Sequence, residues 1–496
     1  MKKILFGIVG LMLMMGNGVY GQEMTITKGQ PGEEMDVMSV ENSWYVGRHG
    51  DHDCWLTRTE NGPKSFVRSD DWMLVEVDRN LKAQGRLELP RTNRCEVLAV
   101  RNIGHYVSLI LVDSNDARSL TLVKCEVDLD SMTLTGGKLD TIVRYEKEPQ
   151  DKSYAWGAVS GNEEYVGMVL LRQMTKKRQY VAEVSLYDEA LNQMWNKEYA
   201  VGTTSSVGVT DMGEVVTLGY EDVGNEAKFT INVVSNSMGE SYLVTIGCDR
   251  IKDMQIVNVI GRKVLCMGLF SPRESDPREE LVGGTVTMVF DLDSGNVTNF
   301  RQRPFENEDI NILLNKKTKK IQRTLRAPMV MPLAVAQTPF GAVAAFGHRH
   351  VLRYMNANGT VSTSFYAQGI HLVAIDEDGN EKWVRNIRRN DMQKNTDEKM
   401  YMSLFTNGGD VCLVKNESKK YPATYDIAKE AKEYELGDKG NMVIYTVSEQ
   451  GDVKKTVMEQ KTKHALVSSA KRGEGEVVML TVEGEKTRMV ELKIGN

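Results

Sequence analysis

The chain alternates between short apolar runs, rich in β-branched residues, and tight polar turns. In HLVAIDEDGNEKWVRNI, residues 371–387, an apolar run ends at Asp376, a polar stretch follows, and a second run carries Trp383. Apolar runs of this length that are bounded by turn residues are typical of β-strands. The stretch therefore predicts two strands joined by a hairpin turn.

This strand–Asp–turn–strand pattern recurs along the chain, and internal repeats of this kind decide the fold. Other copies place the acidic residue at Asp78, Asp128, Asp188 and Asp291. Two further copies carry Ser235 and Ser448 in its place, which makes about seven copies in all. Asp and Ser are favoured at such positions because their side chains hydrogen-bond to the backbone of a turn. We therefore interpret these residues as parts of a structural repeat.

A second element often precedes the hairpin. It consists of a glycine followed by a β-rich run, as in GEVVTLGYE, GRKVLCMGLF and FGAVAAFG. Two strands from this element and two from the hairpin approach a four-stranded sheet per repeat. Radial repetition of such sheets forms a β-propeller, which leaves only short protected edges. We predict an all-β protein with a single β-propeller domain over residues 22–496. Seven four-stranded blades fit the number of copies best, with six or eight as alternatives.

The two ends of the chain are expected to meet in the last sheet. Residues 488–494 form a strand-like run close to the C-terminus, and residues 44–46 form one in the N-terminal region. An open ring would expose unpaired strand edges. We therefore expect residues 44–46 to complete the last sheet and close the ring.

One region departs from the strand pattern. Between residues 304 and 328, apolar residues follow a helical spacing at Ile310, Leu313, Leu314, Ile321 and Leu325. Acidic residues at the start of the region and basic residues at its end complement a helix dipole. We predict a helix inserted between blades over residues 304–328, and a shorter helix over residues 425–435.

The first residues have the pattern of a secretory signal peptide. Lys2 and Lys3 precede an apolar run from Ile4 to Met15, and Val19 and Gly21 occupy the −3 and −1 positions of a cleavage site. We expect cleavage after Gly21 and export of a soluble chain to the periplasm or the cell exterior. No cysteine follows the apolar run, so no lipid anchor is expected. No later segment approaches the roughly 18 apolar residues of a spanning helix.

Bulk composition narrows the classes of function. The chain is 41% hydrophobic and carries a net charge of −6. This charge argues against nucleic-acid binding, which needs a basic footprint. Six cysteines are too few for a disulfide scaffold in so long a chain, and most are expected to be small buried hydrophobes. Cys248 and Cys266, in neighbouring strand-like runs, are the best candidates for a disulfide.

Candidate ligand-binding residues are few. The acidic stretch after Asp376 lacks the bidentate Glu that a calcium loop needs, and a hairpin turn explains its composition. The segments RHGDHDCW and GHRH contain histidine pairs, but neither specifies a complete set of metal ligands. These pairs are His49 with His52 and His348 with His350. No GxSxG, HExxH or glycine-rich phosphate loop is present. We therefore expect no metal and no cofactor, and no catalytic residue can be named.

The A-x-D-x-x-G-x-x-x-W signature of quinoprotein-like propeller repeats is matched by Ala374, Asp376, Gly379 and Trp383. This resemblance implies a Trp that packs between adjacent blades. In the copy that carries Asp188 and Trp195, Leu191 stands where the signature has glycine. No set of residues that would hold a quinone is found, so the resemblance bears on architecture and not on redox chemistry.

A second resemblance covers residues 373–393 and 400–418. Their sequence, a strand–DxxG–W hairpin followed by a strand that ends in Asn, resembles exported β-propeller proteins of Bacteroidota. The resemblance implies a propeller of the cell envelope and transfers no active site.

Two functions fit these observations. The first is a non-catalytic binding or scaffold protein of the bacterial envelope, which recognises another envelope protein or a glycan through loops presented by a rigid ring. It predicts an exposed apolar or aromatic patch on one face or around the inserted helix. The alternative is an enzyme that acts on a carbohydrate or another extracellular substrate in the central funnel. It predicts acidic side chains with shifted pKa values at the channel mouth, and an apolar channel would argue against it.

Overall fold

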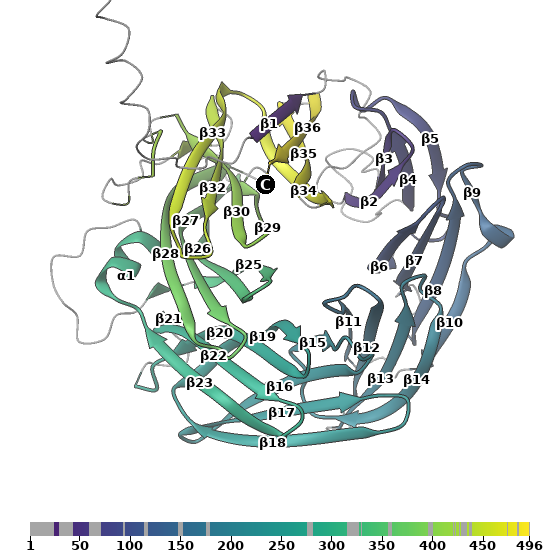
Figure 1. Ribbon diagram of the computed structural model, residues 1–496, viewed down its shortest axis with the longest axis vertical. Helices are drawn as coiled ribbons and strands as arrows, with labels where there is room; N and C mark the ends of the chain where they lie inside the picture. The colour runs from purple at the N-terminus through teal and green to yellow at the C-terminus, as the bar shows by residue number, and fades with distance from the viewer. Residues whose placement is uncertain are drawn as a thin grey trace, which may run out of the picture.

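Eight antiparallel sheets are arranged around a central axis (Figure 1). The computed structural model describes residues 24–28, 43–58, 71–92, 95–113, 118–146, 152–174, 179–274, 281–314, 327–328, 330–355, 360–394, 400–419, 421, 423–425, 427, 434–435, 439–473, 475–483 and 486–495. Within each sheet, four main strands follow one another from the central channel to the periphery. The protein is therefore all-β, with a single eight-bladed β-propeller.

The first four blades are continuous in the chain. Blade 1 comprises β2 (Trp44–His49), β3 (His52–Arg58), β4 (Trp72–Val77) and β5 (Ala83–Glu88). Blade 2 comprises β6 (Cys95–Ile103), β7 (Tyr106–Asp113), β8 (Ser119–Asp128) and β10 (Asp140–Glu146), with the short β9 (Thr133–Leu134) and the 3-10 turn η2 (Thr135–Gly137) between the last two. Blade 3 comprises β11 (Lys152–Val159), β12 (Tyr165–Met174), β13 (Gln179–Asp188) and β14 (Gln193–Val201). Blade 4 comprises β15 (Ser206–Val209), β16 (Val215–Val223), β17 (Glu226–Val234) and β18 (Gly239–Gly247).

The remaining blades carry the additions to the ring. Blade 5 comprises β19 (Arg250–Ile260), β20 (Lys263–Ser271), β22 (Gly284–Asp291) and β23 (Asn296–Pro304). Blade 6 comprises β25 (Val330–Thr338), β26 (Gly341–Met355), β27 (Val361–Asp376), β28 (Glu381–Lys394) and the short parallel β31 (Tyr434–Glu435). Blade 7 comprises β29 (Met402–Asn407), β30 (Asp410–Ser418), β32 (Gly440–Val447) and β33 (Val453–Thr462). A two-stranded ribbon is formed by β21 (Leu281–Val282) and β24 (Ala327–Pro328).

Blade 8 closes the ring with strands from both ends of the chain. It comprises β34 (Ala465–Gly473), β35 (Glu476–Glu483), β36 (Lys486–Ile494) and, outermost, β1 (Met24–Lys28). The C-terminal run thus lies in the last sheet, as the sequence predicted. The prediction that residues 44–46 complete this sheet is wrong, because they begin β2, the innermost strand of blade 1.

The blade number is eight, not the seven that fitted the repeats best, and eight was one of the alternatives. The reason lies in the closure. The seven copies found in the sequence are the hairpins that join the third and fourth strands of blades 1 to 7. In blade 8 the fourth strand is β1, which pairs with β36 from the opposite end of the chain. That blade therefore has no such hairpin and leaves no copy of the pattern.

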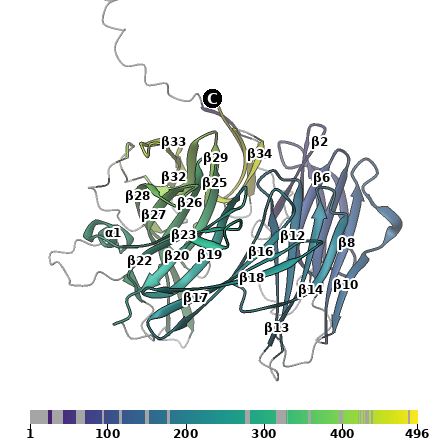
Figure 2. The same ribbon diagram turned by 60° about the horizontal axis from the view of Figure 1, so that its bottom comes forward.

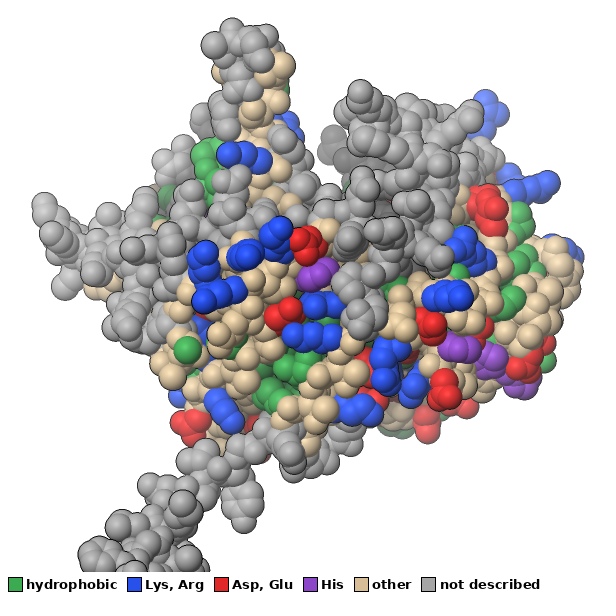
Figure 3. Space-filling model, turned by 90° about the horizontal axis from the view of Figure 1, so that it is seen from above, with side chains coloured by type: hydrophobic (Ala, Val, Ile, Leu, Met, Phe, Trp, Pro, Cys, Tyr) green, Lys and Arg blue, Asp and Glu red, His purple; other side chains and the backbone are tan. Residues whose placement is uncertain are grey.

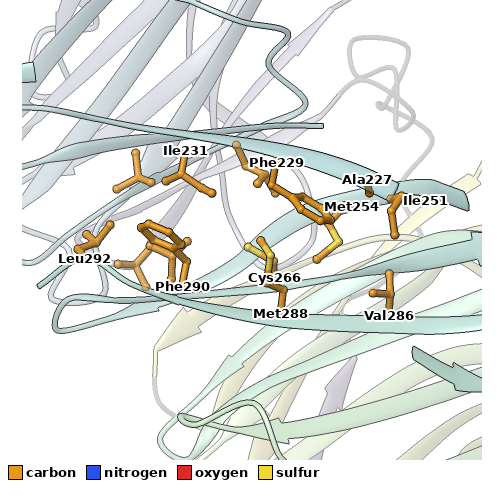
Figure 4. Close-up of a cluster of buried hydrophobic side chains, with 14 of the residues drawn as sticks. Ala227, Phe229, Ile231, Ile251, Met254, Cys266, Val286, Met288, Phe290 and Leu292 are labelled. Atoms are coloured by element: carbon orange, nitrogen blue, oxygen red, sulfur yellow. The ribbon is translucent and has the colours of Figure 1, made fainter. Parts of the chain in front are cut away.

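The hydrophobic core is divided into layers between neighbouring blades. Figure 4 shows the layer between blades 4 and 5, where Phe229 and Ile231 of β17 lie opposite Met288 and Phe290 of β22. Fully burying one such side chain contributes about 1.5–3 kcal/mol. The strands are apolar on both faces because each sheet packs against two neighbours, so their sequences read as continuous apolar runs.

Helix α1 (Asn307–Leu313) lies inside the segment predicted to be helical, on the outer side of the ring (Figure 1). It begins where the Asp309 carboxylate accepts a hydrogen bond from the backbone N–H of Glu306, over 2.9 Å. It is shorter than predicted: residue 314 follows it as a turn, and residues 315–326 lie outside the described residues. The shorter helix predicted over residues 425–435 is wrong at its end, which forms β31.

All six cysteines are free, so the predicted pairing of Cys248 with Cys266 is wrong. Cys266 is buried in the layer between blades 4 and 5, and Cys248 lies partly buried at the edge of the same layer. Across the described part of the chain, no helix is long and apolar enough to cross a membrane.

Candidate functional site

The two faces of the ring differ. In a four-stranded meander, the turn between the first two strands and the turn between the last two lie at one end of the blade, here called the turn face. The connections between the middle strands and between successive blades lie at the opposite end, here called the loop face. Figure 2 shows the strands running between the two faces. The loop face carries the connections from β3 to β4, from β23 to β25 and from β30 to β32. Binding residues are found disproportionately on such loops.

The acidic residues of the sequence repeat lie on the turn face. Oδ1 of Asp376 accepts hydrogen bonds from the backbone N–H groups of Asp378 and Asn380, over 3.0 and 2.8 Å. Oδ2 accepts one from the side chain of Asn380, over 3.1 Å. Gly379 has a φ of +78°, a left-handed conformation that glycine adopts without a steric penalty. Both carboxylate oxygens thus bind the turn itself.

The other repeat residues follow the same design. Asp78 and Asp188 accept paired backbone hydrogen bonds of the same type, with Leu81 and Leu191 in the left-handed conformation. Asp128 and Asp291 accept a backbone N–H three residues on, over 3.0 and 2.7 Å. Hydrogen bonds from the backbone and side chain of Ser294 lower the pKa of Asp291. The structure brings these residues to one face without gathering them into one site.

The turns of the repeat also join the blades. A methyl group added at Gly379 would lie 2.5 Å from Val289 of blade 5, and Asp378 pairs with Lys263 of the same blade over 2.6 Å. Trp383 is buried under the corresponding turn of blade 7, and Trp195 is buried among residues of blades 3 and 4. These residues therefore stabilise the packing of neighbouring blades.

Blade 6 extends beyond the ring at the loop face. β26, β27 and β28 have 15, 16 and 14 residues, whereas strands of the other blades have at most 11. The innermost strand β25 pairs with β26 only as far as Val330 opposite His348. The remainder of β26 pairs with β27 as far as Met355 opposite Val361, whereas β28 pairs with β27 only as far as Lys394 opposite Ser364. This projection, here called the blade 6 extension, therefore has three strands at its base and two at its tip.

The tip of the blade 6 extension exposes apolar side chains. The exposed fractions of Val351, Leu352, Met355 and Val361 are 46%, 50%, 75% and 63%. Met355 lies opposite Val361 in the register, and Val351 lies opposite Phe365. Side chains two residues apart share a face of a strand. Val351, Met355, Val361 and Phe365 therefore lie on one face of the extension, and they are here called the apolar stripe. Leu352 points to the opposite face.

A buried ionic cluster anchors the base of the extension to blade 7. In β28, the guanidinium of Arg389 pairs with Asp391 and donates to the carbonyl of Met400 over 2.6 Å. In blade 7, Glu417 pairs with Lys415 over 3.4 Å and with Lys455.

Two tyrosines complete this cluster. The hydroxyl of Tyr445 donates to Oε2 of Glu417 over 2.6 Å. Burial raises the pKa of Tyr421, and the charges of Asp391 and Glu417 raise it further. Nζ of Lys415 lies 5.6 Å from the centre of the Tyr421 ring. Burial lowers the pKa of Lys455. A buried ion pair is costly to desolvate and contributes more to a defined arrangement than to stability.

A second polar network anchors the outer side of the extension to helix α1. Asp309 accepts hydrogen bonds from Arg303 and from Asn386 of β28, over 3.0 and 2.8 Å. His371 of β27 is fully buried, and its Nδ1 lies 2.7 Å from Oδ1 of Asn386. Burial lowers the pKa of His371. At Gly369, an added methyl group would lie 2.4 Å from the helix backbone, so α1 and β27 are in direct contact.

A cavity of about 170 Å³ lies between the innermost strands of blades 3 to 6, which border the central channel. Its lining includes Val159, Val207, Val209 and Val259, and its amide side chains are Asn258 and Gln337. Asn258 already donates to the carbonyl of Gly341 over 2.8 Å. No residue that lines this cavity is titratable, which argues against an acid–base site there.

Residues of the histidine-rich segment RHGDHDCW contact two different neighbours, blade 2 and blade 8. Nδ1 of His49 and Nδ1 of His52 each lie 3.1 Å from Oε1 of Glu76, and Nε2 of His49 lies 3.0 Å from Asp130 of blade 2. The hydrogen bond to Glu76 is the largest cause that raises the pKa of His49. Asp53 instead pairs with Arg472 of blade 8 at 2.5 Å. Figure 3 shows histidines beside acidic side chains at the edge of this side of the molecule.

The second histidine pair lies on blade 6. His348 is buried, and the ring of His350 stacks on Tyr366 with centroids 4.6 Å apart. In the portion of the chain with a described structure, no group of three or more His, Cys, Asp or Glu residues is arranged to hold a metal ion.

Neither the ionic cluster nor the apolar stripe was predicted from the sequence. In each case the sequence contains a pattern from which it could have been predicted. Lys415 and Glu417 continue the alternation of Val411 and Leu413 on the face of β30 that packs against blade 6. The run GAVAAFGHRHVLRYM continues without a turn residue to Met355.

Comparison with known proteins returns β-propellers of low similarity. No protein-family model and no curated protein matches the chain. The WD40 domain of SCAP from fission yeast is 9% identical with a TM-score of 0.39, over 96% of this chain and 98% of that one. The β-propeller domain of the Trilobed protease from Pyrococcus furiosus is 11% identical with a TM-score of 0.35, over 81% and 94%. Prolyl oligopeptidase B from Galerina marginata is 8% identical with a TM-score of 0.37, over 93% and 55%. At these values none of them indicates what this chain binds or does.

Proposed function

We propose that this protein is a non-catalytic binding protein that holds a partner protein on its loop face. The observation that carries the proposal is the blade 6 extension, whose tip exposes an apolar stripe while its base is anchored on both sides. Exposed apolar groups that gather on a rigid support are typical of protein interaction sites. A preorganised support also lowers the entropic cost of binding.

The chemistry of the stripe favours a protein over a glycan. Its exposed members are Val351, Met355 and Val361, which are aliphatic or flexible. Methionine and aliphatic side chains adapt to apolar side chains of a partner. Sugar rings, in contrast, are usually bound by flat aromatic rings.

The enzyme alternative has less support. It requires ionisable groups at the funnel, whereas the channel cavity is lined by apolar and amide side chains. The groups whose pKa values shift by burial, such as Lys455 and His371, lie between blades and are engaged with neighbouring side chains.

The place of action is proposed from the sequence. The signal-peptide pattern and the resemblance to exported propellers of Bacteroidota support a periplasmic or secreted protein. Its partner would then be another protein of the envelope. Residues 1–21 lie outside the described residues.

The proposal is tested by affinity capture from the envelope of the source cells. The bait is the tagged mature chain, compared with the double variant Val351→Lys/Met355→Lys and with Leu243→Lys. Leu243 is a matched control because it is 68% exposed on β18, in blade 4. We expect a near-stoichiometric protein that survives moderate salt, is captured by Leu243→Lys and is lost with the double variant. Recovery of no protein, or equal recovery by all three baits, would overturn the proposal.

Glycan binding is the second candidate, because two aromatic side chains are exposed on inner strands near the loop face. Trp44, the first residue of β2, is 47% exposed, and Tyr154, near the start of β11, is 45% exposed. A glycan array with the mature chain and with Trp44→Ala tests it. Binding that depends on Trp44 would favour this candidate.

A further inference from the structure

One edge of the blade 6 extension has no neighbouring strand among the described residues. Between Val351 and Met355, β26 pairs with β27 on one side. On its other side, its pairing with β25 ends at His348, and no described strand continues it. In an antiparallel strand, every second residue directs its N–H and C=O groups away from its partner. This edge therefore presents backbone donors and acceptors over five residues, or about 17 Å.

The edge also has little of the usual protection against strand addition. Proteins commonly protect edges with charged side chains, above all lysine, with proline or with a bulge, and the one charged residue here is Arg353. Residues 351–355 contain no proline or lysine, and their register with β27 has no irregularity. The outer strand β33 of blade 7 shows the contrast, since its sequence VKKTVMEQKT carries three lysines. A weakly protected edge on a folded protein is a template for another strand.

The charged side chains beside this edge indicate which kind of added strand would fit it. Arg349 and Arg353 share a face of β26 with Val351 and Met355, because they alternate along the strand. The residues opposite on β27 are Ala367, Phe365, Thr363 and Val361, none of which is acidic. Within the described structure, Arg353 forms no ion pair. An added strand with a carboxylate on this face would meet the basic side chain of Arg353, and cross-strand pairs of opposite charge are stabilising.

A second copy of this chain would fit the edge of β26 less well than an acidic strand would. If two copies of β26 paired antiparallel about Leu352, Val351 would lie opposite Arg353 of the other copy. Four arginines would then lie on one face of the joint sheet. Like charges at such spacing are unfavourable, which favours an acidic strand from a different protein.

We propose that residues 351–355 of β26 receive an extended segment of the partner protein as an added β-strand, and that this segment alternates apolar and acidic residues. Backbone hydrogen bonds provide the affinity, and side chains on alternate positions provide the selectivity. The proposal rests on the proposed function and identifies where and how its partner binds.

The test uses the mature full chain and a fluorescein-labelled nine-residue peptide that alternates valine and glutamate. A second peptide has lysine in place of each glutamate. We expect the glutamate peptide to bind about tenfold more tightly or better, with slowed amide hydrogen exchange at residues 351–355. Arg353→Glu should reverse the preference between the peptides, whereas Leu243→Lys should leave it unchanged. Equal binding of both peptides, no binding, or protection of other amides only would overturn the proposal.

Two further measurements separate the alternatives. A concentration-dependent dimer that Arg353→Glu alters would assign the edge to a second copy, and sedimentation with anionic vesicles that Met355→Lys reduces would assign it to a membrane. Either result overturns the added-strand proposal. If envelope capture yields a partner that does not slow exchange at residues 351–355, the added strand fails while the binding function stands. If capture yields no partner but the glutamate peptide binds as expected, the proposed function fails, while residues 351–355 are still shown to bind an added strand.

Discussion

Trp383 of blade 6 donates a hydrogen bond from its indole nitrogen to the backbone carbonyl of Glu449 in blade 7, over 3.2 Å. The same ring fills the space under the turn that contains Gly451, where an added methyl group would lie 2.8 Å from Cγ of Trp383. Neighbouring blades are thus joined by an aromatic side chain of one and a close-fitting turn of the next. Gly379 meets Val289 of blade 5 in the same way.

This packing makes Gly451 sensitive to the smallest substitution. Gly451 has a φ of +88°, so Gly451→Ala adds backbone strain to the clash with Trp383. We expect the free energy of unfolding to fall by about 2–4 kcal/mol, measured by guanidinium denaturation. Gly408→Ala is the control, because its φ is +57° and nothing lies within 4 Å of an added methyl group. It should cost about 1 kcal/mol, and equal losses would contradict the role given to Trp383.

The fold could be predicted from the sequence as far as the repeat was local. Each hairpin between third and fourth strands requires a turn residue such as Asp376 or Ser448, so the pattern is written in consecutive residues. The closure of blade 8 is not local, since β1 and β36 pair across the whole length of the chain. Nothing in residues 24–28 distinguishes an outer strand of the last blade from any other short strand.

The candidate site was less predictable. An exposed apolar residue such as Met355 and a buried one such as Met442 read alike in a strand pattern. Lys415 and Glu417 read as the polar end of a strand, although both are fully buried. Their partners include Tyr445 and Lys455, which are distant in the sequence and reach Glu417 only because β32 and β33 lie beside β30 in blade 7.

Ring closure by β1 should be essential for stability. Ile26 pairs with Leu492 and packs against the layer between blades 7 and 8. Ile26→Asp places a charge there, and we expect a loss of about 2–3 kcal/mol in the free energy of unfolding. Size-exclusion chromatography should also show larger species, because a detached β1 leaves β36 as an open edge. Thr25→Asp, on the exposed side of β1, should stay within about 0.5 kcal/mol of the wild type.

His371 should make the protein less stable in mild acid. Its folded pKa is lowered by burial, so below its ordinary value near 6.5 the unfolded chain takes up a proton that the folded chain does not. The free energy of unfolding should therefore fall as the pH drops below about 6.5, by up to about 1.4 kcal/mol per pH unit from this group. His350 and His464 act in the same direction, since their pKa values are also lowered by burial.

The variant His371→Gln isolates this contribution, because glutamine can still donate to Asn386 but does not titrate. Denaturation curves between pH 5 and 8 should show a shallower acid dependence for the variant than for the wild type. Identical slopes would mean that His371 does not titrate differently in the folded and unfolded states.

The ionic cluster at the base of the extension should depend on the charge of Glu417. Glu417→Gln keeps the shape of the side chain and still accepts a hydrogen bond from the hydroxyl of Tyr445, but it removes the negative charge beside the buried Lys415 and Lys455. Removing one member of a buried ion pair typically costs about 3–5 kcal/mol. We expect a loss of this size in guanidinium denaturation, together with faster amide exchange in residues 388–394. Glu476→Gln breaks the exposed pair with Lys493 and should cost at most about 1 kcal/mol. If both variants lose the same stability, the cluster does not anchor the extension, and the apolar stripe would lose the rigid base on which its binding role depends.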